Sequence, residues 1–106
     1  MIVGTTHVRL KGVDAAERGT ERGDAATAAM VAIVDGKDLS CRLTGEKTHR
    51  REVGYCTTAD GVDINREIIA KGAALACPRY DVRYARFEQA AALAAQPRAS
   101  YCVKRF

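Results

Sequence analysis

The segment that most constrains this chain is residues 8–17, which read VRLKGVDAAE. Its first half alternates apolar and basic side chains, in the order Val8, Arg9, Leu10 and Lys11. A period of two predicts a short strand with one apolar and one cationic face, interrupted at Gly12. Asp14 and Glu17 are then expected in the turn that follows, where side chains are free to reach a ligand.

The same two acids also fit the Asp-x-x-Glu pattern of a helix N-terminus, in which both carboxylates accept hydrogen bonds from free backbone N–H groups. Short motifs of this kind often occur by chance. Residues 8–17 alone therefore leave a ligand site and a helix cap as alternatives for Asp14 and Glu17.

The start of the chain predicts a β-hairpin. Residues 1–4 indicate the end of a strand, residues 4–6 a turn, and residues 7–12 the returning strand, on which His7 is expected to be solvated. Residues 18–24 are rich in glycine and charge, so they are expected to form a flexible loop.

From Ala25 the pattern changes to the spacing of a helix that stops at residues 35–36, where Asp-Gly is a common helix end. The apolar stripe of this helix consists of Ala26, Ala29, Met30, Ile33 and Val34. Residues 39–43 and 53–57 then alternate like strands, and the charged segment 45–51 is expected to join them.

The second half of the chain predicts two more helices. Residues 60–61 read Asp-Gly, a tight-turn signal, and a short helix follows, closed by Gly72. Its apolar residues are Ile64, Ile68 and Ile69. After the apolar connection 73–77, a final helix is expected to end before Pro97. One face of that helix is marked by Tyr80, Tyr84, Phe87, Ala91 and Ala94.

This order of strands, helix, strands and two helices predicts an α+β fold of the OB class: a small Greek-key β-barrel with three helices, one inserted after the third strand. Such a barrel needs five strands, and the chain supplies two at its start where three are required. We therefore expect an incomplete five-stranded barrel whose first strand is missing or shortened. A length of 106 residues, 47% of them hydrophobic, fits a single domain over residues 1–106.

Charge and cysteine content narrow the function classes. The net charge of +4 suits a polyanionic partner without requiring one. No apolar run approaches the roughly 18 residues that span a membrane. The cysteines Cys41, Cys56, Cys77 and Cys102 lack C-x-x-C spacing, which gives a zinc ribbon or a thioredoxin-like site no support. They could be buried free thiols, or two disulfides formed outside a reducing cytosol.

Two distant features form a recognisable set with the acids and arginine of residues 8–17. The first is Arg51, which opens the pattern Arg-x-Val-x-x-Cys, and the second is residues 60–65, which read DGVDIN. Arg79 and Tyr80 follow in the same order. With this succession the chain resembles the staphylococcal nuclease (thermonuclease-like) family from about residue 4 to residue 93, nearly its whole length.

The resemblance implies a metal-dependent nuclease that hydrolyses phosphodiester bonds of single-stranded or flexible DNA or RNA. Arg9 and Arg51 would clamp the phosphate, because a planar guanidinium donates two parallel hydrogen bonds to phosphate oxygens. Glu17 would be the general base that orients or deprotonates the attacking water. The Asp14 carboxylate and the backbone carbonyl of Ala15 would be ligands of Ca²⁺, which prefers oxygen donors.

Three departures from the family pattern affect this expectation. The family's other metal-binding aspartate lies in an Asp-Gly-Asp-Thr motif just before the position of Ile2 and is not in this sequence, so Ca²⁺ is expected to bind weakly. His49 stands where the family usually has an aromatic residue, and Pro78 stands where it has a base-stacking tyrosine. Tyr80 retains the next aromatic, so His49 and Tyr80 are the expected substrate contacts, with altered base stacking.

The resemblance also bears on cysteines, location and assembly. Cysteines at these positions in exported relatives look like the pairs Cys41–Cys56 and Cys77–Cys102, which implies a periplasmic or secreted full-length form, although this sequence shows no signal peptide. A shortened barrel leaves a sheet edge exposed, which favours a homodimer. Two functions stay open: a calcium-dependent nuclease, and a nuclease-fold module that binds a polyanion or protein partner with weak or no cleavage.

Overall fold

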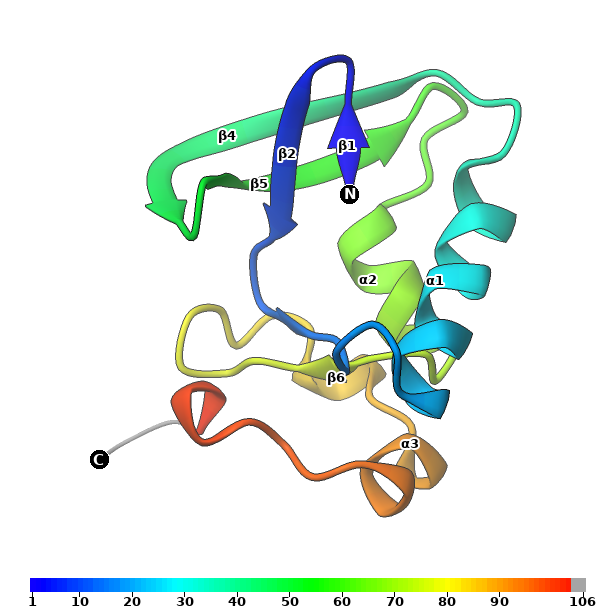
Figure 1. Cartoon of the computed structure of the whole chain (residues 1–106), viewed down its shortest axis with the longest axis vertical. Coiled ribbons are helices and arrows are strands. Elements are labelled where there is room, and N and C mark those ends of the chain that lie inside the picture. The colour runs from blue at the N-terminus through cyan, green and yellow to red at the C-terminus, as the bar shows by residue number, and fades with distance from the viewer. Residues whose placement is uncertain (104–106) are drawn as a thin grey trace.

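The computed structural model describes residues 1–103 and contains two small sheets and three α-helices in that range (Figure 1). The first sheet has the strand order β1 (Ile2–Val3), β2 (Thr6–Leu10), β5 (Arg51–Thr58) and β4 (Leu39–Thr48). The second sheet pairs β3 (Val13–Asp14) with β6 (Leu75–Ala76). The α-helices are α1 (Glu21–Val34), α2 (Ile64–Ala70) and α3 (Ala90–Ala95), and the 3-10 helices are η1 (Ala85–Phe87) and η2 (Ser100–Cys102).

The arrangement confirms an α+β fold of the predicted class with an open barrel. The β-hairpin β1–β2 and the helix–strand order agree with the sequence, and three short strands, not two, precede α1. The third of these, β3, pairs with β6 outside the four-stranded sheet, so the described strands do not close into one barrel. The predicted domain limit at residue 106 lies outside the described residues.

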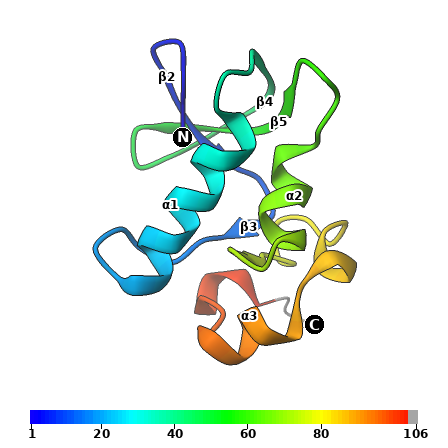
Figure 2. The ribbon, with the colours of Figure 1, turned by 90° about the vertical axis from the view of Figure 1, so that its right-hand side faces the viewer.

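The core lies between the four-stranded sheet and the helices α1 and α2, which run side by side (Figures 1 and 2). The three isoleucines of α2 are at most 2% exposed, and they belong to the same cluster of buried residues as Val8 and Leu10. Burial of each such side chain contributes about 1.5–3 kcal/mol. No helix among residues 1–103 is long and apolar enough to cross a membrane.

Two disulfides join the cysteines as the resemblance implied. Cys41 and Cys56 face each other on β4 and β5 with their Cα atoms 4.1 Å apart, and Cys77 and Cys102 have Cα atoms 4.4 Å apart. The alternative of four free thiols is therefore wrong. The second disulfide attaches η2 to the residue that follows β6, which fixes the C-terminal segment against the body of the domain.

Two loop predictions were wrong. The loop expected over residues 18–24 ends at Thr20, because the Thr20 hydroxyl accepts a hydrogen bond from the Gly23 amide at 3.0 Å and starts α1 at Glu21. The charged segment 45–51 is mostly strand, because β4 and β5 continue to a tight turn at residues 49–50. Backbone pairing between β4 and β5 extends both strands beyond the residues whose apolar side chains alternate.

The final helix is much shorter than predicted, although it does end before Pro97. Residues 78–89 form turns and η1 because the acids of this segment bind backbone amides: Asp81 accepts from Arg83 N and Glu88 accepts from Ala76 N. A local bond such as that of Asp81 to the amide two residues later competes with helix formation. The prediction of which face of α3 is buried was also wrong, because Ala92 is buried while Ala91 and Ala94 are exposed.

Candidate functional site

A pocket of about 980 Å³ brings together most of the residues singled out in the sequence. It lies between β2, the end of the β4–β5 hairpin, the segment before α1 and the C-terminal segment. Six of the predicted site residues line it, namely Arg9, Ala15, Glu17, His49, Arg51 and Tyr80. Asp14 does not line this pocket.

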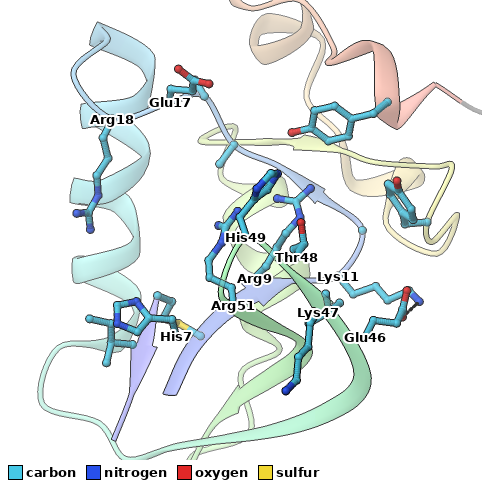
Figure 3. A pocket seen from close by; sticks show the side chains of 18 residues that line it. His7, Arg9, Lys11, Glu17, Arg18, Glu46, Lys47, Thr48, His49 and Arg51 are labelled. Carbon is cyan, nitrogen blue, oxygen red and sulfur yellow. Dashed lines mark hydrogen bonds and ion pairs between the residues drawn. The ribbon is translucent and has the colours of Figure 1, made fainter. Parts of the chain in front are cut away.

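The two arginines converge because of the strand register. Strands β2 and β5 run parallel, with Arg9 opposite Val53. Side chains alternate along a strand, so Arg51 shares a face with Val53 and therefore with Arg9. Figure 3 shows both arginines directed into the same region of the pocket, near His49. The opposite face of β2 is buried through Val8 and Leu10, which confirms the alternation predicted for this strand.

The hairpin turn places the third predicted residue of this group. His49 and Arg50 have φ angles of 46° and 67°, in the left-handed region that few residues other than glycine adopt. Two successive residues of this kind make the tight turn whose twist matches a β-hairpin. The turn pairs Thr48 with Arg51 and directs His49 into the pocket.

Asn65 holds the two arginine-bearing strands together, a role that sequence reasoning missed. Its side chain is fully buried, and its Oδ1 accepts a hydrogen bond from Cys56 N at 3.0 Å. Its Nδ2 donates to Lys11 O at 3.0 Å and Gly54 O at 3.2 Å, and thus links β5 to the residue that follows β2. A polar residue between the buried isoleucines of α2 was the signal that could have identified it.

The pocket carries a surplus of positive charge. Five Lys or Arg side chains line it against two Glu. Lys11 forms an ion pair with Glu46, and the Lys47 Nζ lies 3.8 Å from a Glu52 carboxylate oxygen. Within residues 1–103 no ion pair involves the remaining three, Arg9, Arg18 and Arg51. Burial, followed by repulsion from Arg51 and Arg18, lowers the pKa of the Met1 amino group in the same pocket.

Glu17 lies at the margin of the pocket and not among the arginines. It is exposed, and Figure 3 shows its carboxylate apart from Arg9 and Arg51 and turned away from them. None of the ion pairs in the described part of the chain includes it. The helix-cap alternative for Glu17 is wrong, because Thr20 caps α1 and only the Glu17 backbone carbonyl takes part, accepting from the Thr20 hydroxyl at 2.6 Å.

Asp14 lies elsewhere than predicted. It was expected in an open turn, but it belongs to β3, is 4% exposed, and its Oδ2 accepts a hydrogen bond from Ala99 N at 2.7 Å. Residues 1–103 contain no group of three or more His, Cys, Asp or Glu side chains that could hold a metal ion. Ca²⁺ takes about six to eight oxygen ligands, so the donors available at Asp14 and Ala15 do not fit that ion.

Tyr101 is a lining residue that the sequence patterns did not reveal. It belongs to η2, next to the disulfide-bonded Cys102, and it reaches the pocket together with Tyr80. The Cζ atom of Arg9 lies 5.8 Å from the centroid of the Tyr101 ring. No periodic pattern marks Tyr101, since its position depends on contacts between segments far apart in the chain.

Comparisons with known proteins agree with the residue pattern. Residues 7–101 match the family described as "Staphylococcal nuclease homologue". The chain is 36% identical over 78 residues to a protein of Oryza sativa subsp. japonica named "Probable staphylococcal-like nuclease CAN1". That match covers 72% of this chain and 23% of the rice protein, so the chain spans less than a quarter of that relative's length. No solved structure matches the chain significantly.

Proposed function

The chain belongs to the staphylococcal nuclease family, and from this membership we propose that it binds single-stranded or flexible nucleic acid in the arginine pocket and hydrolyses its phosphodiester bonds. One observation carries the proposal. Arg9 and Arg51, which lie 42 positions apart by their numbers in the sequence, meet in one pocket and form no ion pair in the described part of the chain.

The proposed clamp follows from guanidinium chemistry. Each guanidinium is planar and donates parallel N–H groups that match two phosphate oxygens, and its charge does not titrate in the physiological range. A phosphate between Arg9 and Arg51 would receive two positive charges where negative charge grows during attack on phosphorus. His49 would add a further donor from the hairpin turn.

Glu17 is the proposed general base. In the reaction the water oxygen bonds to phosphorus, its proton passes to the Glu17 carboxylate, and one ester oxygen leaves with its bonding electrons. The carboxylate is turned away from the arginines, so it must rotate into the pocket to reach the attacking water. Catalytic groups often reach hydrogen-bond distance only in the complex with substrate.

Calcium dependence is proposed from the family resemblance alone. The oxygen donors around Asp14 do not fit a Ca²⁺ site, for the reasons given above, and no step of the proposed mechanism passes through the ion. Because the residues present hold this ion poorly, we expect cleavage to be feeble, and a calcium chelator tests whether the remaining rate depends on the ion.

The alternative is a nuclease-fold module that binds a polyanion or a protein partner without cutting. Two observations favour it: the Asp14 carboxylate is used internally by Ala99, and Glu17 does not face the arginines. The arginine pocket itself serves either function.

Two further expectations belong with this proposal. Export of the protein is supported by the disulfides, which persist mainly in oxidising compartments. The homodimer through the exposed sheet edge at β1 stays a prediction, and static light scattering at micromolar concentration tests it. Monomer alone would contradict the homodimer.

A nuclease assay on a labelled single-stranded oligonucleotide separates the two functions. We expect slow cleavage that Glu17→Gln and Arg51→Ala abolish and that Arg86→Ala leaves unchanged, since Arg86 is exposed and outside the pocket. Adding an N-terminal strand that bears an aspartate should raise the rate by orders of magnitude, and the Glu17 and Arg51 substitutions should remove that gain. Binding without cleavage in both forms would favour the module. Full activity unaffected by Glu17→Gln would refute the mechanism.

A further inference from the structure

Tyr101 is an exposed aromatic ring beside a cation that has no ion pair in the described chain. The residue is 48% exposed, although it lines the arginine pocket, and the Arg9 guanidinium carbon lies 5.8 Å from its ring centroid. A single exposed apolar side chain is normal and by itself needs no explanation. An exposed ring next to Arg9, the proposed phosphate ligand, provides an apolar face where a strand's base would lie.

Three contacts hold the backbone on either side of Tyr101. Cys102, the next residue, is completely buried and disulfide-bonded to Cys77. The Cys102 carbonyl accepts a hydrogen bond from Arg79 N at 3.1 Å. On the other side of η2, Ala99 N donates to the buried Asp14 carboxylate at 2.7 Å. The backbone that carries the ring is therefore fixed, which lowers the conformational entropy lost when the ring binds a ligand.

Tyr80 supplies a second ring at the same pocket. It is 46% exposed, and the Cζ atom of Arg79 lies 5.7 Å from its ring centroid. The two tyrosines come from segments that the Cys77–Cys102 disulfide joins. Each combines an exposed ring with a neighbouring guanidinium, the pairing that proteins use to hold bases and phosphates of single strands.

We propose that Tyr101 stacks on an unpaired nucleobase of the strand whose phosphate Arg9 holds, with Tyr80 as a second stacking surface. The inference rests on the proposed function and specifies its substrate: a strand with free bases, since bases inside a duplex are stacked on one another. Stacking on an aromatic ring tolerates any base, so the pocket selects single strands without selecting sequence.

Binding measurements that separate bases from phosphates test this inference. Fluorescence anisotropy would compare end-labelled oligothymidylate with an abasic deoxyribose-phosphate oligomer of equal length, in chelator to prevent cleavage. Tyr101→Ala should weaken oligothymidylate binding at least about fivefold and leave the abasic oligomer unchanged. Tyr101→Phe keeps the ring and should bind like the parent. Leu93→Ala is the control, because Leu93 is 46% exposed and lies outside the pocket.

Three results of these binding measurements would count against the stacking inference. Equal binding of oligothymidylate by Tyr101→Ala and the parent would overturn the stacking inference while leaving the arginine pocket intact. An equal loss for both oligomers would also overturn it, because Tyr101 would then act through Arg9 or the fold. A parent chain that binds neither oligomer would refute the proposed function itself, and the stacking inference with it.

Discussion

Salt dependence of binding tests the arginine pocket most directly. Binding of a cationic site to a nucleic acid strand releases counterions, and the logarithm of the association constant falls by about 0.7 per phosphate contact for each tenfold rise in salt. The pocket offers three arginines without ion pairs in the described chain, Arg9, Arg18 and Arg51. The parent chain should therefore show a slope of about −2 on single-stranded oligonucleotides.

Arg51→Ala should reduce that slope to about −1.4, because one of three contacts is removed. At 0.1 M salt each contact contributes roughly a fivefold increase in affinity, or about 1 kcal/mol, so the variant should bind about five times more weakly. Anisotropy titrations with a labelled oligonucleotide between about 0.05 and 0.3 M NaCl, again in chelator, give both quantities.

Arg86→Ala is the matched control for this experiment. It removes the same charge, but Arg86 lies on η1 outside the pocket, with its Cζ atom 4.8 Å from the Phe87 ring centroid. The parental slope and affinity should persist. If Arg86→Ala lowered the slope as much as Arg51→Ala, net charge alone would explain binding. A parental slope in Arg51→Ala would show that Arg51 contacts no phosphate.

Three further predictions concern the framework of the site. Replacing both Cys77 and Cys102 by serine opens a loop of sequence separation 25 and should lower the free energy of unfolding by about 3.5 kcal/mol in urea titrations, and a loss under about 1 kcal/mol would contradict this. Asn65→Ala should lower the free energy of unfolding by about 2–4 kcal/mol, because it leaves backbone groups of Lys11, Gly54 and Cys56 without their hydrogen-bond partner. An unchanged urea midpoint would exclude the bridging role. Burial and then the hydrogen bond to Asp81 raise the pKa of Tyr55 to about 12, so stability from this tyrosine is complete below pH 10.0 and declines as pH rises toward 12. In an ultraviolet titration, Tyr55→Phe should lack a tyrosinate signal that the parent chain shows near pH 12. If the missing signal were instead one near pH 10, the raised pKa of Tyr55 would be refuted.

Local sequence patterns predicted the part of the site that lies on β2. Val8 and Leu10 alternate with Arg9, and burial of the two apolar residues determines which face the arginine occupies. The same logic predicted the ends of α1 and α2, where glycines take positive φ angles after the last helical turn. In each case the deciding interactions lie within a few residues of one another.

Other parts of the site could not be predicted because they depend on contacts between distant segments. The position of Arg51 follows from its pairing with Thr48 across a hairpin whose charged residues show no apolar alternation. The strand β6 has only two residues and exists because β3 pairs with it. Tyr101 reaches the pocket through a disulfide and a hydrogen bond that join residues 77 and 14 to the C-terminal segment.

Asp14 shows how burial changes what a recognised motif can do. Gly12, with φ of +78°, lets the chain leave β2 beneath Tyr84, and a Cβ at this position would lie 2.9 Å from the Tyr84 ring. The chain then enters β3, where the Asp14 carboxylate meets the amide of Ala99 instead of solvent. One oxygen of that carboxylate is thereby used to seat the segment that carries Tyr101. The motif that resembles half of a metal site therefore acts in this chain as the anchor of an aromatic side chain beside the arginines.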